Sequence, residues 1–504
     1  MDMELQHTKL GGFRPVYDNL IRQEETLESI VPDALPDIGR IVETSGTVFL
    51  RQRETVDGSV RVTGTARTAV LYLPEEGETP CCLTLNIPFL CSGDHPAIQS
   101  GCLAHVSARV ISADAQELNP RKILARVELA VGMTAYLEEQ AELCCGVECG
   151  EGDGVQTLIE THKDFIAVDV TEKNFNFSDV LRLPPSRSAM EQLLSARTEL
   201  SCAEAKVIGK KLVVKGEAVL TALYSGQGGV CSARFELPFS QIIEIKTAGD
   251  ECDIWAEAAL TGMECTMRTE SELEVNFDVL LQAVVRQERD VSTLADLYSV
   301  SHPLETERKN VALCPLVEQG GRRQIARQFC PCDAPARQVI QCTLTIGEIT
   351  QVPSGENAMV TAKAYADVLY LSEAGELCAA SYTVPASCEI PMPENSRCLC
   401  RCRPAGEAAA TPVTGGLEIR FEAEFIYLIT RNEEYSCISA VRPGEESECA
   451  CERPSVVIRM VGEGERLWDI AKCCGSTVAN IQTANAMTTE EAPCGTVLLI
   501  PRCR

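Results

Sequence analysis

The sequence is poor in the residues that most often hold metals or stack on sugars and bases. It has two tryptophans and five histidines in 504 residues. Positive charge is also scarce, because 45 lysines and arginines face 73 aspartates and glutamates, for a net charge of -28 at pH 7. Such a chain repels phosphate backbones and anionic membrane surfaces. We therefore expect no nucleic-acid partner.

Long apolar runs are missing as well. No stretch approaches the roughly 18 apolar residues that a membrane-spanning helix needs, so we expect no membrane insertion. Residues 1–13 contain no apolar core of the length found in signal peptides. These features favour a cytoplasmic protein. The hydrophobic content of 45% is typical of folded globular domains.

Cysteine, in contrast to these scarce residues, is abundant, with 27 in the sequence. The count is odd and no export signal is apparent, which argues against a disulfide framework. Where the cysteines cluster, they form adjacent pairs or C-x-C, and no two C-x2-C knuckles face each other as zinc sites usually require. We expect no metal site and no cofactor. Most of the thiols are expected to be small buried apolar side chains; the alternative is that exposed thiols cross-link when a surrounding assembly is oxidised.

One segment recurs three times along the chain. The copies read VTGTARTAVLY, VKGEAVLTALY and VTAKAYADVLY, and they end at Tyr72, Tyr224 and Tyr370. A proline follows 16, 14 and 15 residues after these tyrosines, in the triplets IPF, LPF and VPA. Such regular spacing indicates an internal triplication. A small residue lies eight positions before each tyrosine; these residues are Gly64, Gly216 and Ala362.

Each copy closes with a run that is typical of β-strands. In residues 417–425 apolar side chains occupy every second position, which is the pattern of a strand with one buried face. Turn-like stretches separate such runs. Each copy therefore predicts an antiparallel β-sandwich or open barrel. A proline followed by apolar residues precedes each β core, at residues 35–46, 183–196 and 333–342, and predicts a short flanking helix.

The predicted fold is mainly β, with a small α+β domain at the C-terminal end. The repeats resemble the SPOCS-type domain, a repeat of unknown biochemical activity in spore-coat and related proteins of endospore-forming bacteria. Polar stretches rich in glycine or proline mark the boundaries. The expected segments are an N-terminal extension (residues 1–29), three repeats (30–146, 178–290 and 325–435), an acidic linker (442–454) and a C-terminal domain (455–503).

The C-terminal domain follows a different pattern. A β-rich stretch at residues 456–461 leads into ERLWDIAKCCGS, in which apolar residues recur at helical spacing up to Cys474. Gly475 can end this helix in a left-handed conformation. Residues 476–477 are good N-caps for a second helix, and residues 496–500 form a final strand. The predicted order is strand, helix, helix, strand.

This βααβ order, together with the L-W-x-I-A motif, resembles the LysM domain. We expect Trp468 to pack beside the small core and not to stack on a ligand. The resemblance implies a core made of Leu467, Trp468, Ile470, Ala471, Ile481, Asn485, Ile500 and Pro501. It also implies a binding groove between two loops, lined by Gly464, Glu465, Arg466, Leu467, Ala486, Met487 and Thr488.

LysM domains generally bind glycans that contain N-acetylglucosamine, such as peptidoglycan. This sequence departs from the family pattern: Arg459 replaces the usual aromatic residue of the first strand, and Glu465-Arg466 replaces the customary Asp-Thr pair. Neutral sugars prefer flat apolar platforms, whereas charged rims suit protein recognition better. A protein partner and a glycan partner both stay open.

SPOCS-type repeats followed by a LysM domain resemble a family of spore-coat morphogenesis proteins. The resemblance implies a non-enzymatic scaffold in the mother-cell cytoplasm that assembles at the forespore surface. Its LysM domain would bind the basement-layer ATPase of the coat, and other coat proteins are further candidates. The alternative is a peptidoglycan-binding protein of the cell wall or spore cortex. We expect no catalytic residues, since the sequence has no G-x-S-x-G, no H-E-x-x-H and no phosphate-binding loop.

Overall fold

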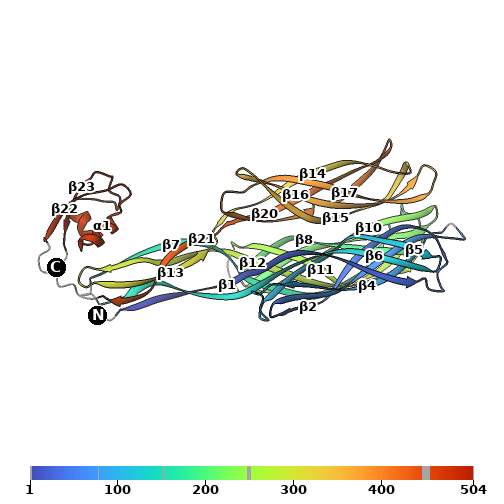
Figure 1. Ribbon diagram of the computed structural model, residues 1–504. Coiled ribbons are helices and arrows are strands. Elements are labelled where there is room, and N and C mark those ends of the chain that lie inside the picture. The colour runs from blue at the N-terminus through green and yellow to red at the C-terminus, as the bar shows by residue number, and fades with distance from the viewer. Residues whose placement is uncertain (1–2, 78, 151–153, 247–250, 445–453, 503–504) are drawn as a thin grey trace.

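The computed structural model describes residues 3–77, 79–150, 154–246, 251–444 and 454–502. Within these ranges the chain is mainly β, as predicted, with long antiparallel strands and two short helices. Figure 1 shows an elongated molecule, in which slender ribbons extend from bundles of strands toward a small domain that contains the helices. No helix in the described ranges is long and apolar enough to cross a membrane.

Three units with the same strand order carry the three sequence repeats. Each unit has a lead strand, then a three-stranded sheet, then the closing strands. The first unit contains β1 (Glu4–Ile30), β2 (Ile38–Val56), β3 (Ser59–Pro74), β4 (Cys81–Asp94), β5 (Leu103–Asn119) and β6 (Lys122–Glu148). The second contains β7 (Val155–Arg182), β8 (Met190–Ile208), β9 (Lys211–Gly226), β10 (Gly229–Glu244), β11 (Asp253–Thr269) and β12 (Glu272–Ser299). The third contains β14 (Leu316–Pro331), β15 (Ala336–Ser354), β16 (Asn357–Ser372), β17 (Leu377–Pro391), β18 (Ser396–Pro404), β19 (Ala409–Val413) and β20 (Gly416–Arg431).

Each unit packs two antiparallel layers against each other. One layer is the sheet β2-β3-β4, β8-β9-β10 or β15-β16-β17. The other layer joins the lead strand to the closing strands, in the orders β1-β6-β5, β7-β12-β11 and β14-β20-β18. In the third unit β18 and β19 both pair with β20 and together replace a single closing strand. The prediction of three antiparallel β repeats is confirmed.

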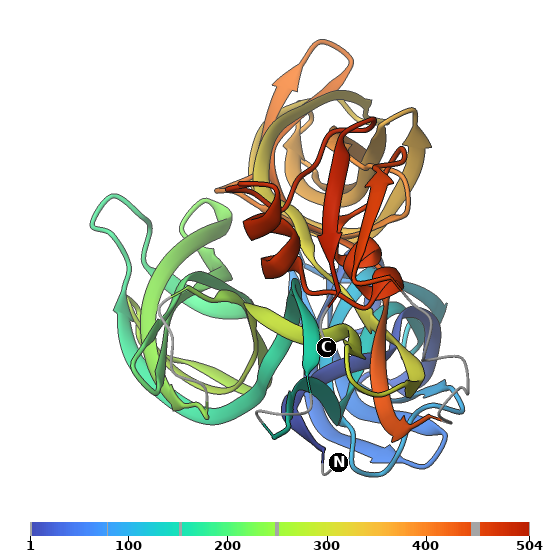
Figure 2. The same cartoon turned by 90° about the vertical axis from the view of Figure 1, so that its left-hand side faces the viewer.

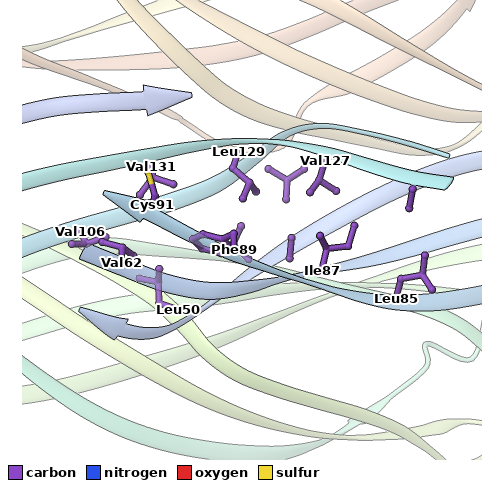
Figure 3. Close-up of a cluster of buried hydrophobic side chains, with 14 of the residues drawn as sticks. Leu50, Val62, Leu85, Ile87, Phe89, Cys91, Val106, Val127, Leu129 and Val131 are labelled. Carbon is purple, nitrogen blue, oxygen red and sulfur yellow. The ribbon is translucent and has the colours of Figure 1, made fainter. Parts of the chain in front are cut away.

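Buried and exposed residues alternate along these strands. In β20, every second residue from Leu417 to Phe425 is at most 2% exposed. Figure 3 shows a stripe of the same kind in the first unit, where alternate β4 side chains from Leu85 to Cys91 gather with residues of the facing layer. Burial of each large apolar side chain contributes about 1.5–3 kcal/mol. The space between the two layers is therefore the core of each unit.

The predicted flanking helices at residues 35–46, 183–196 and 333–342 are wrong, because these segments lead into strands β2, β8 and β15. Each of these strands begins with two register shifts three residues apart. A β-bulge adds one residue to a strand, so the packed apolar residues lie three apart instead of two and imitate a helix in the sequence. The shifts follow Ile38 and Ile41, Met190 and Leu193, and Ala336 and Val339.

The small residue that precedes each repeat tyrosine has a packing role. Gly216 lies opposite Phe239 on the adjacent strand. A Cβ on Gly216 would come within 2.3 Å of the Phe239 ring and 2.4 Å of the Ser201 carbonyl oxygen. The first unit has the same glycine–phenylalanine pair. In the third unit the facing residues are Ala362 and Ala386. The methyl group of Ala386 stands where the other units have a phenylalanine ring, which leaves room for the methyl group of Ala362.

Three two-stranded ribbons continue beyond the units and pack together. They are formed by β1 with β6, β7 with β12, and β13 (Leu304–Leu313) with β21 (Glu433–Pro443). Figure 2 looks along the ribbons and shows the three units arranged around them. We call this ribbon bundle the stalk (residues 4–13, 138–148, 155–167, 286–299, 304–313 and 433–443). Two clusters of buried apolar residues each draw on all three ribbons; their members are Leu143, Cys144, Val291, Leu294, Leu297, Leu313 and Ile438.

The stalk corrects the predicted boundaries. Residues 1–29, expected as an N-terminal extension, contribute most of β1, which pairs with β6. The other lead strands also begin before the predicted repeats, at Val155 and Leu316. Parts of the ribbon strands bury few side chains, as in β13, where Leu313 is the one buried residue, so their composition is polar and resembles that of linkers. The predicted linker at residues 442–454 lies largely outside the described residues.

Replacing Gly216 with alanine is expected to lower the free energy of unfolding by about 1–3 kcal/mol, because the new methyl group overlaps Phe239 and the Ser201 backbone. Gly101→Ala is the matched control, since a Cβ at that position meets no atom within 4 Å. Urea unfolding followed by circular dichroism measures both variants. Equal stability of the two proteins would contradict the packing role of Gly216.

Candidate functional site

The C-terminal domain has the predicted order of strand, helix, helix, strand. Its elements are β22 (Val456–Met460), α1 (Leu467–Cys474), α2 (Val478–Ala484) and β23 (Val497–Pro501). Gly475 ends α1 with a left-handed φ of 66°, and Thr477 caps α2 by accepting a hydrogen bond from the Asn480 amide at 3.1 Å. We call residues 455–502 the C-terminal module.

Side chains from both helices and both strands fill the core of the module. Asn485, at the end of α2, ties the second helix to β23: its amide nitrogen donates to the Leu499 carbonyl at 2.7 Å, and its oxygen accepts from the Leu499 amide at 2.8 Å. Pro501 ends β23, and its carbonyl accepts a hydrogen bond from the buried Ser476 hydroxyl. The buried apolar residues are Val461, Leu467, Ile470, Ala471, Ile481, Leu498 and Ile500.

The first loop of the expected groove is largely occupied by contacts within the protein. Glu465 pairs with Arg459 and accepts a hydrogen bond from the Gly462 amide at 3.0 Å. Arg466 forms two ion pairs: its Nη1 lies 3.4 Å from Oε1 of Glu160 in the stalk, and its Nε lies 3.3 Å from Oδ2 of Asp469. Gly464 is exposed in a left-handed turn with φ 74°.

The remaining groove residues divide between core and surface. Leu467 is 2% exposed, so its side chain belongs to the core. In the second loop, Met487 is half-buried against the same core. Ala486 has a positive φ of 51° and is exposed, as is Thr488. Leu467 and Met487 thus both pack in the core, whereas the other expected groove residues lie at the surface of the two loops.

The module docks on the end of the second ribbon through Trp468. The indole nitrogen of Trp468 donates to Asp296 Oδ2 at 2.9 Å. The indole ring packs edge-on against Tyr298, with ring centroids 4.9 Å apart. Tyr298 is part of the module's own core cluster, and its hydroxyl donates to the Ser476 carbonyl at 2.9 Å. An edge-to-face aromatic pair contributes about 0.5–1.5 kcal/mol beyond its burial. Trp468 therefore stiffens the joint between module and stalk.

Asp296 is the electrostatic centre of this joint. Its carboxylate accepts from Lys472 Nζ at 2.7 Å and pairs with Arg308 at 2.9 Å, in addition to the bond from Trp468. The side chain is 13% exposed. Burial alone would raise the pKa of Asp296, but the hydrogen bonds from Lys472 and Trp468 outweigh it and hold the pKa below its ordinary value. The carboxylate is thus ionised at neutral pH.

Sequence reasoning missed both stalk residues of this joint. Asp296 and Tyr298 lie between the predicted second and third repeats (178–290 and 325–435), in a stretch for which the sequence predicted no domain. The signal was the apolar-rich heptapeptide LADLYSV at residues 294–300, which is unusual for a linker. Nothing in that stretch points to a partner such as Trp468, which lies 172 residues further along the chain.

The cysteines and other potential ligands of the described ranges do not gather into a second site. In the described ranges, no three His, Cys, Asp or Glu side chains come together as metal ligands would. Burial raises the pKa of several thiols, to about 12 for Cys82, Cys202 and Cys342, which keeps them protonated and unreactive. The exposed cysteines of the described ranges are Cys149, Cys473 and Cys494.

Comparison with protein families identifies two of the units. A family model described as SipL, SPOCS domain matches residues 37–117 and 189–268. The two matches cover equivalent strands, β2 to β5 in the first unit and β8 to β11 in the second. The chain is therefore SipL-like in these regions, and this domain family points to a sporulation-related role. No curated protein and no solved structure matched the chain.

Asp296→Asn is expected to release the C-terminal module from the stalk, because the neutral amide loses the ion pairs with Lys472 and Arg308. Hydrogen bonds to a charged group contribute about 1.5–3 kcal/mol each. In a Trp255→Phe background, the fluorescence of Trp468 reports release by a shift to longer wavelength. Asp290→Asn, at an exposed position of the same strand, is the control. An unchanged spectrum in Asp296→Asn would contradict the docking role.

Acid is expected to undock the module in the same way. Because the pKa of Asp296 lies below its ordinary value of 3.8, its ionised form stabilises the docked state above that value, and this contribution is lost as the pH falls through the lowered pKa. The Trp468 emission should stay constant from about pH 8 to about pH 5 and shift only at more acid pH. Asp296→Asn should abolish this transition. A transition near neutral pH would point to a different group.

Proposed function

We propose that this SipL-like chain, with its SPOCS domains, is a non-enzymatic scaffold of endospore coat assembly. Its C-terminal module resembles a LysM domain. In this proposal the module binds a protein instead of a glycan. The partner that the family resemblance implies is the basement-layer ATPase of the spore coat. The scaffold acts in the mother-cell cytoplasm and assembles at the forespore surface.

The position of Trp468 is the observation that favours a protein partner. Trp468 is the only aromatic residue in the sequence of the module. Its ring packs against Tyr298 and its nitrogen donates to Asp296, so it is not free to stack on a sugar. Carbohydrate sites rely on flat aromatic or apolar platforms with a few convergent polar groups. The first groove loop is also engaged, through Arg466 and Glu160.

The architecture supports a scaffold role. The three β units lie at one end of the stalk, and the module lies at its other end (Figure 1). The joint at Asp296 holds the module in a defined orientation. A rigid arrangement of this kind presents the units and the module to different partners at the same time, which is what an assembly adaptor requires.

Removing residues 455–504 is expected to abolish binding of the basement-layer ATPase, while the full chain binds it. Surface plasmon resonance with the purified ATPase measures both proteins, and the folded state of the truncated chain is checked by circular dichroism. Co-sedimentation of the full chain with insoluble peptidoglycan tests the alternative. Equal ATPase binding by the truncated chain, or strong retention on peptidoglycan without ATPase binding, would overturn the proposal.

A further inference from the structure

We infer that the outer face of the β22–β23 sheet is the docking surface of the module, and that its occupant is a protein segment whose apolar side chains are flanked by lysine or arginine. This inference rests on the proposed function, since it names the surface and the partner chemistry by which the module binds protein. We call this surface the outer sheet face. It consists of Val456, Ile458, Met460, Val497 and Leu499.

The outer sheet face is a contiguous apolar patch. Strands β22 and β23 pair antiparallel, with Ile458 opposite Leu499 and Met460 opposite Val497. Alternate residues of a strand point to the same side, so all five side chains share one face. Their exposed fractions run from 42% for Leu499 to 71% for Ile458. Residues between them, such as Leu498 and Ile500, are buried in the core.

The apolar composition of the outer sheet face favours a protein partner. Scattered exposed apolar residues are ordinary, but a contiguous group on one face marks an interaction site or an aggregation liability. The outer sheet face has no aromatic ring and no polar side chain, so it offers a sugar neither a stacking platform nor a hydrogen bond. It does match an apolar strand or helix, which buries such side chains on binding.

The joint with the stalk leaves this face free. The module docks through α1, by Trp468 and Lys472. Helix α1 also supplies Leu467, Ile470 and Ala471 to the core beneath the sheet. The sheet lies on the opposite side of that core, so the stalk does not cover its outer face. The stalk thus orients the module with its apolar face outward.

The charges beside the patch select the partner. Two loops lie at the Met460–Val497 end of the sheet, one after β22 and one before β23. The Gly495 amide donates a hydrogen bond to the Val461 carbonyl and links them. These two loops carry the exposed carboxylates Glu463, Glu490 and Glu491, and no ion pair among the described residues involves them. A cationic flank on the partner would complement them. A second copy of this chain would instead bring two molecules of net charge -28 together.

The test uses the full chain and the purified basement-layer ATPase as the probe. Ile458→Glu is expected to weaken binding about 10- to 100-fold, as substitution at the centre of an interface does. Ile208→Glu is the matched control, because Ile208 is 64% exposed on the second unit, away from the module. It should bind like the wild type. The double variant Glu490→Gln with Glu491→Gln should slow association at low salt, with the difference vanishing at high salt.

The outcomes separate this inference from the proposed function. If the wild-type chain does not bind the ATPase, the proposed function fails. If it binds and Ile458→Glu binds equally well, the proposed function stands and the outer sheet face is excluded. Sedimentation velocity of the wild type and of Ile458→Glu tests for a second copy as the occupant. A dimer that is lost in the variant would overturn the choice of a cationic partner.

Discussion

The packing of three β-ribbons into one stalk is the interaction on which the rest of the structure depends. In the first two units, the lead strands β1 and β7 and the last strands β6 and β12 run for 27 or 28 residues. The same strands therefore build a two-layer unit at one end and the stalk at the other. A two-stranded ribbon is unstable alone in water. Here the ribbons bury Leu294, Ile438 and their neighbours against each other, which fixes the positions of the three units.

The sequence predicted the strands of the β units better than the contacts between distant parts of the chain. Period-two alternation in residues 417–425 predicted a half-buried strand, and the spacing of the repeat tyrosines predicted three related units. The flanking helices were wrong because paired bulges at Ile38 and Ile41 give strand residues a helix-like spacing. The stalk was missed because parts of its strands are mostly exposed and polar, as along β13. Local patterns report how a strand is buried, but they do not report which distant strand it meets.

The same limit applied to the C-terminal module. The spacing of Leu467, Ile470 and Ala471 predicted a helix with one buried face, and Gly475 predicted its end, since both features are local. Trp468 was expected to pack beside the core. Its actual partners, Asp296 and Tyr298, come from the stalk, and a contact between such distant segments leaves no periodic signal. The joint attaches the module to the stalk, which ties the orientation of the module to the fold of the second unit.

The stalk and the module form one structural unit through Tyr298 and Trp468. Amide hydrogen exchange of the full chain and of Tyr298→Ala measures this coupling directly. Residues 294–299 and residues 467–474 are expected to lose protection together in the variant, while β16 of the third unit keeps its protection. Unchanged protection of residues 467–474 would contradict the coupling of stalk and module.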